Sequence, residues 1–108
     1  MLPELSLQIL LALGQGPAHG YAIGKDIEQR SDGRLGITTG ALYQALKRLA
    51  DDGFIRASSA AQHEGGDARR KVFVLTPAGR AAAAAELRRL ANLVSVGRER
   101  QLYRAGAR

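Results

Sequence analysis

The sequence predicts a mainly α-helical domain with one small β-hairpin, and three observations support this prediction. Apolar residues recur at three- to four-residue spacing in four separate segments, as they do in helices packed on one side. One further segment has period two, with Val72 and Val74 on one face and Phe73 and Leu75 on the other. The length of 108 residues is that of one domain.

The first two helices are predicted over Pro3–Leu13 and Gly20–Arg30. The first shows helical spacing at Leu2, Leu5, Ile9 and Leu13 and ends in a segment rich in glycine and proline. The second is expected to bury Tyr21, Ile23 or Gly24, and Ile27. A turn at Ser31, Asp32 and Gly33 and a short extended piece over Leu35–Ile37 follow.

The third helix has the clearest pattern in the chain. Thr38 or Thr39 can serve as its N-cap, and Gly53 can end it in the left-handed conformation. One apolar stripe faces inward and the opposite face is polar. The stripe consists of Leu42, Leu46 and Leu49, and the polar face of Tyr43, Gln44, Lys47, Arg48 and Asp51.

A β-hairpin and a long last helix complete the pattern. The strands are predicted at Phe54–Ala57 and Arg69–Thr76, joined by a polar loop over Ser58–Ala68. Thr76 caps a helix that runs from Pro77 to about Tyr103, weakened or bent at Gly97. This helix has its own apolar stripe, formed by Leu87, Leu90, Ala91 and Val94.

This order of elements is that of a winged helix-turn-helix followed by a long C-terminal helix. The second and third helices form the helix-turn-helix, the third is the recognition helix, and the hairpin is the wing. We expect residues 1–76 to form the winged domain and residues 77–108 to form a dimerisation helix and tail, all within one compact unit. The alternative is that the last helix folds back on its own domain.

The charge of the chain favours a polyanionic partner. Sixteen Lys and Arg against ten Asp and Glu give a net charge of +6 and a pI of about 10.5. Residues 54–108 carry eleven of the basic and four of the acidic residues, so the positive charge lies in the C-terminal half. The alternative interpretation is a basic face that only keeps the protein solvated.

A helix with a polar and basic face fits the DNA major groove, and a basic wing can contact phosphates. The small residues of the first turn of the third helix allow the DNA backbone to approach closely. Gln44 has the amide suited to adenine, and Lys47 or Arg48 can reach guanine or phosphate. The residues predicted to bind DNA are Thr38, Thr39, Gly40, Tyr43, Gln44, Lys47, Arg48, Arg69, Arg70 and Lys71.

Each of these residues also has a purely structural interpretation. Thr39 can be only a cap, and Tyr43 can simply pack against the next element. Lys47 and Arg48 can be solvated surface charges. The basic run Arg69–Lys71 can limit aggregation of the strand that it precedes.

Three motifs resemble the PadR family of transcriptional regulators. They are GALYQALKRLADDGFI (Gly40–Ile55), ARRKVFVLTPAGR (Ala68–Arg80) and HGYAIGKDIE (His19–Glu28). Ala50 stands where the family usually has Glu, which puts a local ion pair in doubt, and Phe73 stands where Tyr is common. The resemblance implies a homodimeric repressor whose subunits associate mainly through the last helix and which binds a pseudo-palindromic operator. Some members of the family also respond to a small molecule.

The apolar stripe of the last helix exceeds what a small core needs, which independently favours a dimer. The expected interface residues are Leu87, Leu90, Ala91, Val94 and Leu102. An effector pocket needs aromatic walls, and Tyr103 is the aromatic residue that remains to line an interface cavity. A single tyrosine argues against a sensor that stacks aromatic drugs. The expected partners are double-stranded DNA, a second copy and, as the resemblance implies for some members, a small-molecule effector.

Other classes of protein are not supported by the sequence. With no Cys and with His19 and His63 far apart, we expect no enzyme activity, no cofactor and no metal site. No targeting or membrane segment is apparent, so a cytoplasmic protein with no membrane partner is expected. The alternative function is a winged-helix protein-interaction module, against which the polar and basic face of the third helix argues.

Overall fold

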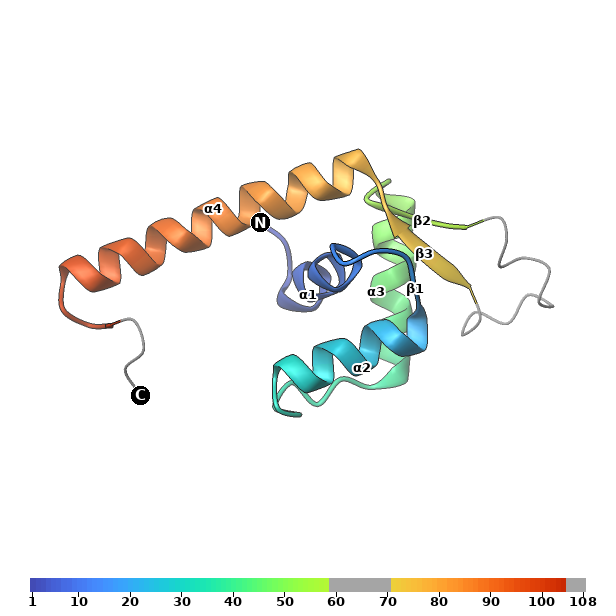
Figure 1. Cartoon of the computed structure of the whole chain (residues 1–108), viewed down its shortest axis with the longest axis horizontal. Helices are drawn as coiled ribbons and strands as arrows, with labels where there is room; N and C mark the ends of the chain where they lie inside the picture. The colour runs from blue at the N-terminus through green and yellow to red at the C-terminus, as the bar shows by residue number, and fades with distance from the viewer. Residues whose placement is uncertain (59–70, 105–108) are drawn as a thin grey trace.

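The computed structural model describes residues 1–58 and 71–104 and confirms the predicted winged helix-turn-helix with a long last helix (Figure 1). The first three helices pack together with a small sheet at one end, and the last helix runs along the top of the domain and past it. The elements are α1 (Glu4–Leu13), β1 (Ala18–His19), α2 (Gly20–Arg30), α3 (Thr39–Asp51), β2 (Ile55–Ala57), β3 (Val72–Leu75) and α4 (Pro77–Glu99).

The core is formed by the apolar stripes of the first three helices, closed by the sheet and by one residue of α4. The predicted stripe of α3 is buried, and Leu46 and Leu49 are at most 2% exposed. Ile23 and Ile27 bury the inner face of α2, whereas Tyr21, which the sequence placed inward, is 66% exposed. That prediction was wrong because isoleucines already fill this face.

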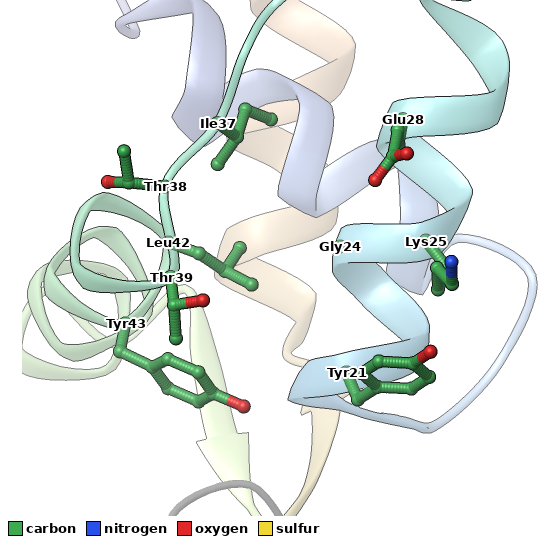
Figure 2. Close-up of a pocket in the computed structure, with 9 residues that line it drawn as sticks. All are labelled: Tyr21, Gly24, Lys25, Glu28, Ile37, Thr38, Thr39, Leu42 and Tyr43. Carbon is green, nitrogen blue, oxygen red and sulfur yellow. The ribbon is translucent and has the colours of Figure 1, made fainter. Parts of the chain in front are cut away.

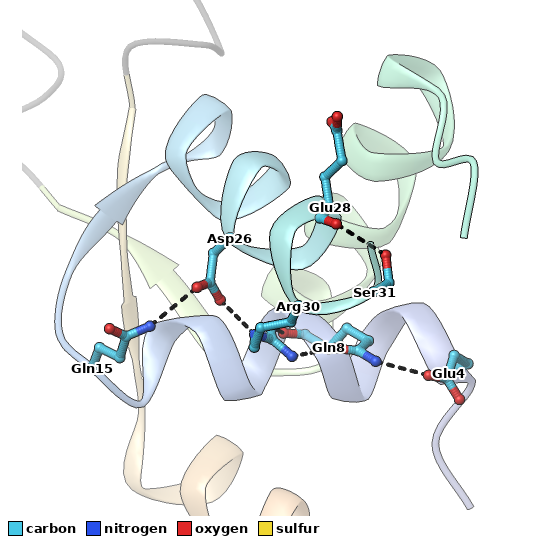
Figure 3. Close-up of polar contacts among 7 residues, drawn as sticks. All are labelled: Glu4, Gln8, Gln15, Asp26, Glu28, Arg30 and Ser31. Carbon is cyan, nitrogen blue, oxygen red and sulfur yellow. Dashed lines mark hydrogen bonds and ion pairs between the residues drawn. The ribbon is translucent and has the colours of Figure 1, made fainter. Parts of the chain in front are cut away.

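A polar cluster holds α1 against α2 on the outside of the core (Figure 3). The Arg30 guanidinium binds Asp26 at 2.9 Å and donates to both the side chain and the backbone carbonyl of Gln8. Gln15 donates to the same Asp26 carboxylate at 3.3 Å. Arg30 therefore serves the fold, although it is one of the few basic residues in the first half of the chain.

The sheet has three strands in the order β1-β3-β2, one strand more than the hairpin predicted. Ala18 and His19 pair antiparallel with Phe73 and Val72. A two-residue strand is too short to show a period-two pattern, so sequence reasoning missed it. β3 covers Val72–Leu75 of the predicted strand 69–76, of which 69 and 70 lie outside the described residues. The extended piece predicted over Leu35–Ile37 is not a strand, because Leu35 belongs to the turn over residues 31–35.

The end of α3 agrees with the sequence prediction, whereas the end of α4 does not. Gly53 has φ +81° and ends α3 as predicted, with the Phe54 N–H donating to the Leu49 carbonyl at 2.9 Å. α4 instead ends at Glu99, short of the predicted Tyr103. Gln101 adopts φ +63° and the Leu102 N–H donates to the Gly97 carbonyl, so the helix ends in a left-handed turn without the glycine that is usual there.

A compact junction joins the end of α3 to the start of α4. The Thr76 hydroxyl donates to the Gly53 carbonyl at 2.6 Å and accepts from the Gly79 N–H at 3.0 Å, which caps α4 as predicted. The Thr76 N–H donates to the Phe54 carbonyl at 3.1 Å. A Cβ on Gly79 would lie 1.9 Å from that same carbonyl oxygen, so only glycine fits there. The junction fixes the direction of α4 relative to α3.

The first half of α4 also packs on the domain through a buried carboxylate. Glu86 is 7% exposed and pairs with Arg89, with the closest N–O distance at 2.6 Å. The hydrogen bond from Arg89 lowers the pKa of Glu86, burial opposes this effect, and the backbone N–H of Leu2 adds to the lowering. The carboxylate thereby ties the N-terminal segment to α4.

No helix among residues 1–58 and 71–104 is long and apolar enough to cross a membrane.

We predict that Gly79→Ala destabilises the fold by about 2 kcal/mol or more, because the added methyl group overlaps the Phe54 carbonyl. Gly40→Ala is the matched control, since nothing lies within 4 Å of a Cβ there, and it should stabilise the protein by up to about 1 kcal/mol. Urea unfolding measures both changes. Equal unfolding midpoints for the two variants would show that the junction is not tight.

Candidate nucleic-acid interface

Helix α3 presents the polar face that the sequence predicted. Gln44, Lys47 and Arg48 are exposed, whereas Leu42, Ala45 and Leu46 of the same helix are buried. The burial of one face determines which side chains the other offers to a partner. The predicted DNA-reading side chains of α3 therefore lie together on one accessible surface.

The first turn of α3 separates the two threonines that the sequence left undecided. The Thr38 hydroxyl accepts the Ala41 N–H at 3.0 Å, so Thr38 is the N-cap. Thr39 is exposed and lines a cavity beside the helix start. Gly40 is exposed, with open space where a side chain would be. A DNA backbone could approach this turn closely.

Tyr43 has a structural contact in addition to its predicted DNA contact. Its ring lies on Gly20, the first residue of α2, where a Cβ would come within 2.7 Å of the hydroxyl oxygen. The side chain is partly buried and packs against the core. Tyr43 thus sets the distance between the two helices of the helix-turn-helix, and its role toward DNA stays a prediction.

Lys47 of α3 is held in place only by an exposed ion pair. Lys47 forms an ion pair with Asp51 at 3.2 Å, but both side chains are more than 60% exposed. Exposed pairs of this kind contribute little to stability. Lys47 can therefore exchange Asp51 for a phosphate at small cost.

The wing carries the remaining predicted contacts. Lys71 is half-buried and directly precedes β3, next to the Ser58 N–H that donates to the Val72 carbonyl. Arg69 and Arg70 lie outside the described residues. Because β2 and β3 pair antiparallel, the end of β2 and the start of β3 project together from the domain, at the end next to α3 (Figure 1).

A cavity of about 330 Å³ opens between α2 and α3, next to the start of α3 (Figure 2). Its lining brings two residues that the sequence did not select, Tyr21 and Lys25, next to the predicted contacts Thr38 and Thr39. The Lys25 ammonium lies 5.7 Å from the centre of the Tyr21 ring. The signal that could have identified Tyr21 is that Ile23 and Ile27 suffice to fill the inner face of α2.

The predicted interface residues of α4 divide into two groups. Leu90 is partly buried against the domain's own core, so α4 does pack back on its domain as far as Leu90. Leu87 and Val94 are 41% and 43% exposed, and Ala91 is also exposed. Leu102 lies beyond the helix and is 83% exposed. The sequence pattern missed Leu93, which is 54% exposed in the second half of α4.

Tyr103 follows the end of α4 and is 47% exposed. The Arg98 guanidinium carbon lies 5.9 Å from the centre of its ring. Among the described residues, no group of three or more acidic or histidine side chains could hold a metal ion.

Residues 9–85 match the model of the transcriptional regulator PadR-like family. The chain belongs to this family. Over 77 residues it is also 44% identical to an uncharacterized 37.1 kDa protein in transposon TN4556 of Streptomyces fradiae, which covers 71% of the chain. The chain spans only 20% of that relative's length.

Solved structures share the fold of this PadR-like chain. A PadR family transcription regulator from Clostridium difficile superposes with a TM-score of 0.74 at 24% identity, covering 90% of this chain and 97% of the other. ZitR from Lactococcus lactis, solved in complex with DNA, has a TM-score of 0.62 at 21% identity, covering 92% and 60%. At these identities the likeness establishes the winged-helix fold.

Proposed function

We propose that this PadR-like regulator binds duplex DNA sequence-specifically as a homodimer and represses transcription from a pseudo-palindromic operator. The observation that carries the proposal is the exposed face of α3, on which Gln44, Lys47 and Arg48 stand clear of the core. An amide and two cations on one helix face match the donor and acceptor pattern of base edges and phosphates. The structure of ZitR with DNA supports the use of this fold for DNA binding.

The exposed apolar side chains of α4 support the dimer. Leu87, Leu93 and Val94 leave large apolar side chains exposed on one helix, on either side of the face that packs on the core. The molecule extends 54 Å along its longest axis but only 20 Å along its shortest, because α4 reaches past the domain. A second copy of α4 would bury this face. The two recognition helices would then read half-sites about 34 Å apart or at a multiple of that distance.

We also propose that a small-molecule effector releases the DNA. Tyr103 and Arg98 lie together just past the exposed stretch of α4, where a second copy would dock. An aromatic ring and a guanidinium at the edge of a dimer interface can line a cavity that neither copy forms alone. Titration with candidate compounds should release DNA from the wild type and not from Tyr103→Ala.

The DNA-binding proposal predicts a steep dependence of affinity on salt. Neutralising roughly six phosphates gives a log–log slope near −5 between about 50 and 200 mM salt. On duplexes recovered by in vitro selection, Gln44→Ala should cost about 1–3 kcal/mol at particular base pairs. Arg70→Ala should weaken binding to all sequences alike. Fluorescence anisotropy measures both effects.

Affinity that ignores salt would rule out phosphate binding and would favour a protein partner for the face of α3. Equal effects of Gln44→Ala and Arg70→Ala on every duplex would contradict the division between base reading and backbone contact.

The dimer proposal predicts that Leu93→Asp gives a monomer, because it places a charge in an apolar interface. Sedimentation velocity measures the change at a concentration at which the wild type is a dimer. Leu35→Asp is the matched control, since Leu35 is 38% exposed in the α2–α3 connection, on the far side of the domain from α4 (Figure 1). A Leu93→Asp variant that sediments as the wild-type dimer would place the interface elsewhere.

A further inference from the structure

We propose that Lys47 is a site of acylation and that its modification releases the protein from DNA. The acyl donor is an acyl phosphate such as acetyl phosphate, whose carbonyl carbon reacts with an exposed primary amine. This inference rests on the DNA-binding function proposed above and adds a chemical reaction that turns it off. The observation that carries it is the placement of lysine and arginine over the fold.

The lysines of this chain are few and lie on or beside one surface. Thirteen of the sixteen basic residues are arginines, and the three lysines are Lys25, Lys47 and Lys71. Lys47 is on the exposed face of α3, and Lys71 directly precedes β3 in the wing. Lys25 lines the cavity next to the first turn of α3 (Figure 2). Every lysine therefore belongs to the proposed DNA-binding surface or adjoins it.

Arginines supply the positive charge in the rest of the fold. Residues 77–108 contain seven basic residues, all of them arginines. The polar cluster between α1 and α2 and the buried Glu86 likewise depend on arginines, Arg30 and Arg89. A guanidinium stays protonated at neutral pH, whereas the lysine amine is the ordinary target of acetylation. Acylation of the lysines thus changes the DNA-facing surface and leaves the proposed dimer interface and the internal ion pairs intact.

Lys47 is the lysine whose modification changes the face of α3 most. Its side chain is 79% exposed, and its ammonium lies 3.2 Å from the Asp51 carboxylate. An exposed pair of this kind opens at little cost, so the amine is accessible to a donor. Acetylation removes the positive charge and leaves the Asp51 carboxylate without its cation. The surface that approaches phosphate then loses an attraction and gains a repulsion.

The reaction with acetyl phosphate needs no other co-reactant. The ammonium first loses a proton to water, and the neutral amine attacks the acetyl carbonyl carbon. A C–N bond forms, and the C–O bond to the phosphate breaks. Phosphate leaves with the electron pair of that bond, and a second proton passes from the nitrogen to water. The product is an uncharged amide.

The test measures DNA affinity before and after treatment with acetyl phosphate, on a selected duplex and on a scrambled duplex of equal length. Mass spectrometry of proteolytic peptides locates the acetyl groups. Acetylation at Lys47 should lower the affinity of the wild type about tenfold or more on both duplexes. It should also reduce the salt slope by about one for each copy bound. Sedimentation velocity should show an unchanged state of association, because no lysine lies on α4.

Two variants assign the effect to the lysine side chains, each compared with its own untreated form. In the triple variant Lys25→Arg, Lys47→Arg, Lys71→Arg, the N-terminal amine is the remaining target, so treatment should not change the affinity. The single variant Lys47→Arg should lose clearly less than the wild type. Thermal unfolding before and after treatment excludes a folding defect.

The outcomes separate this inference from the function on which it rests. If Lys47 carries the acetyl group and the affinity is unchanged, the inference is wrong and the DNA-binding function stands. An equal loss in the triple variant, or acetyl groups at Lys25 and Lys71 but not at Lys47, would also overturn it. An untreated wild type that binds neither duplex would overturn both proposals.

Discussion

The position of α4 relative to α3 depends on the close approach of Gly79 to the Phe54 carbonyl. There the first turn of α4 lies directly on the turn that ends α3, and Thr76 bonds to both elements at once. The left-handed Gly53 exposes the carbonyl that Thr76 uses. Because these contacts involve backbone atoms and one short side chain, they leave little freedom for α4 to pivot on α3. The helix proposed to contact DNA and the helix proposed to form the dimer interface are thereby held as one rigid unit.

This rigidity would let the two surfaces act together in the proposed DNA-binding dimer. On α3, burial of the leucine stripe leaves the polar face outward, and on α4 the apolar side chains continue past the end of the domain. A second copy that covers α4 would fix the separation of two recognition helices, which is what a pseudo-palindromic site requires. The contact between Tyr43 and Gly20 extends the same constraint to α2.

Much of the fold could be predicted because helix periodicity and turn residues agree. The bounds of α2, the cap at Thr76 and the left-handed end at Gly53 were all predicted from the sequence. What was missed depends on contacts between distant residues or on unusual local geometry. β1 exists only through its pairing with β3, Gln101 ends α4 without a glycine, and the exposure of Tyr21 follows from how the isoleucines fill the core. Apart from the partly buried Tyr43, the residues predicted to bind DNA on α3 are exposed. Their roles toward DNA stay predictions, because the structure contains the protein chain alone.

The most direct test of the rigid unit is a distance measurement between the two copies of a dimer. The chain has no cysteine, so a single Ala50→Cys substitution on the exposed surface of α3 allows one spin label per copy. Pulsed electron paramagnetic resonance should give one narrow distance distribution that stays unchanged when DNA is added. The same label in a Gly79→Ala background should give a broad distribution. A broad distribution in the otherwise wild-type protein, narrowed only by DNA, would contradict the account.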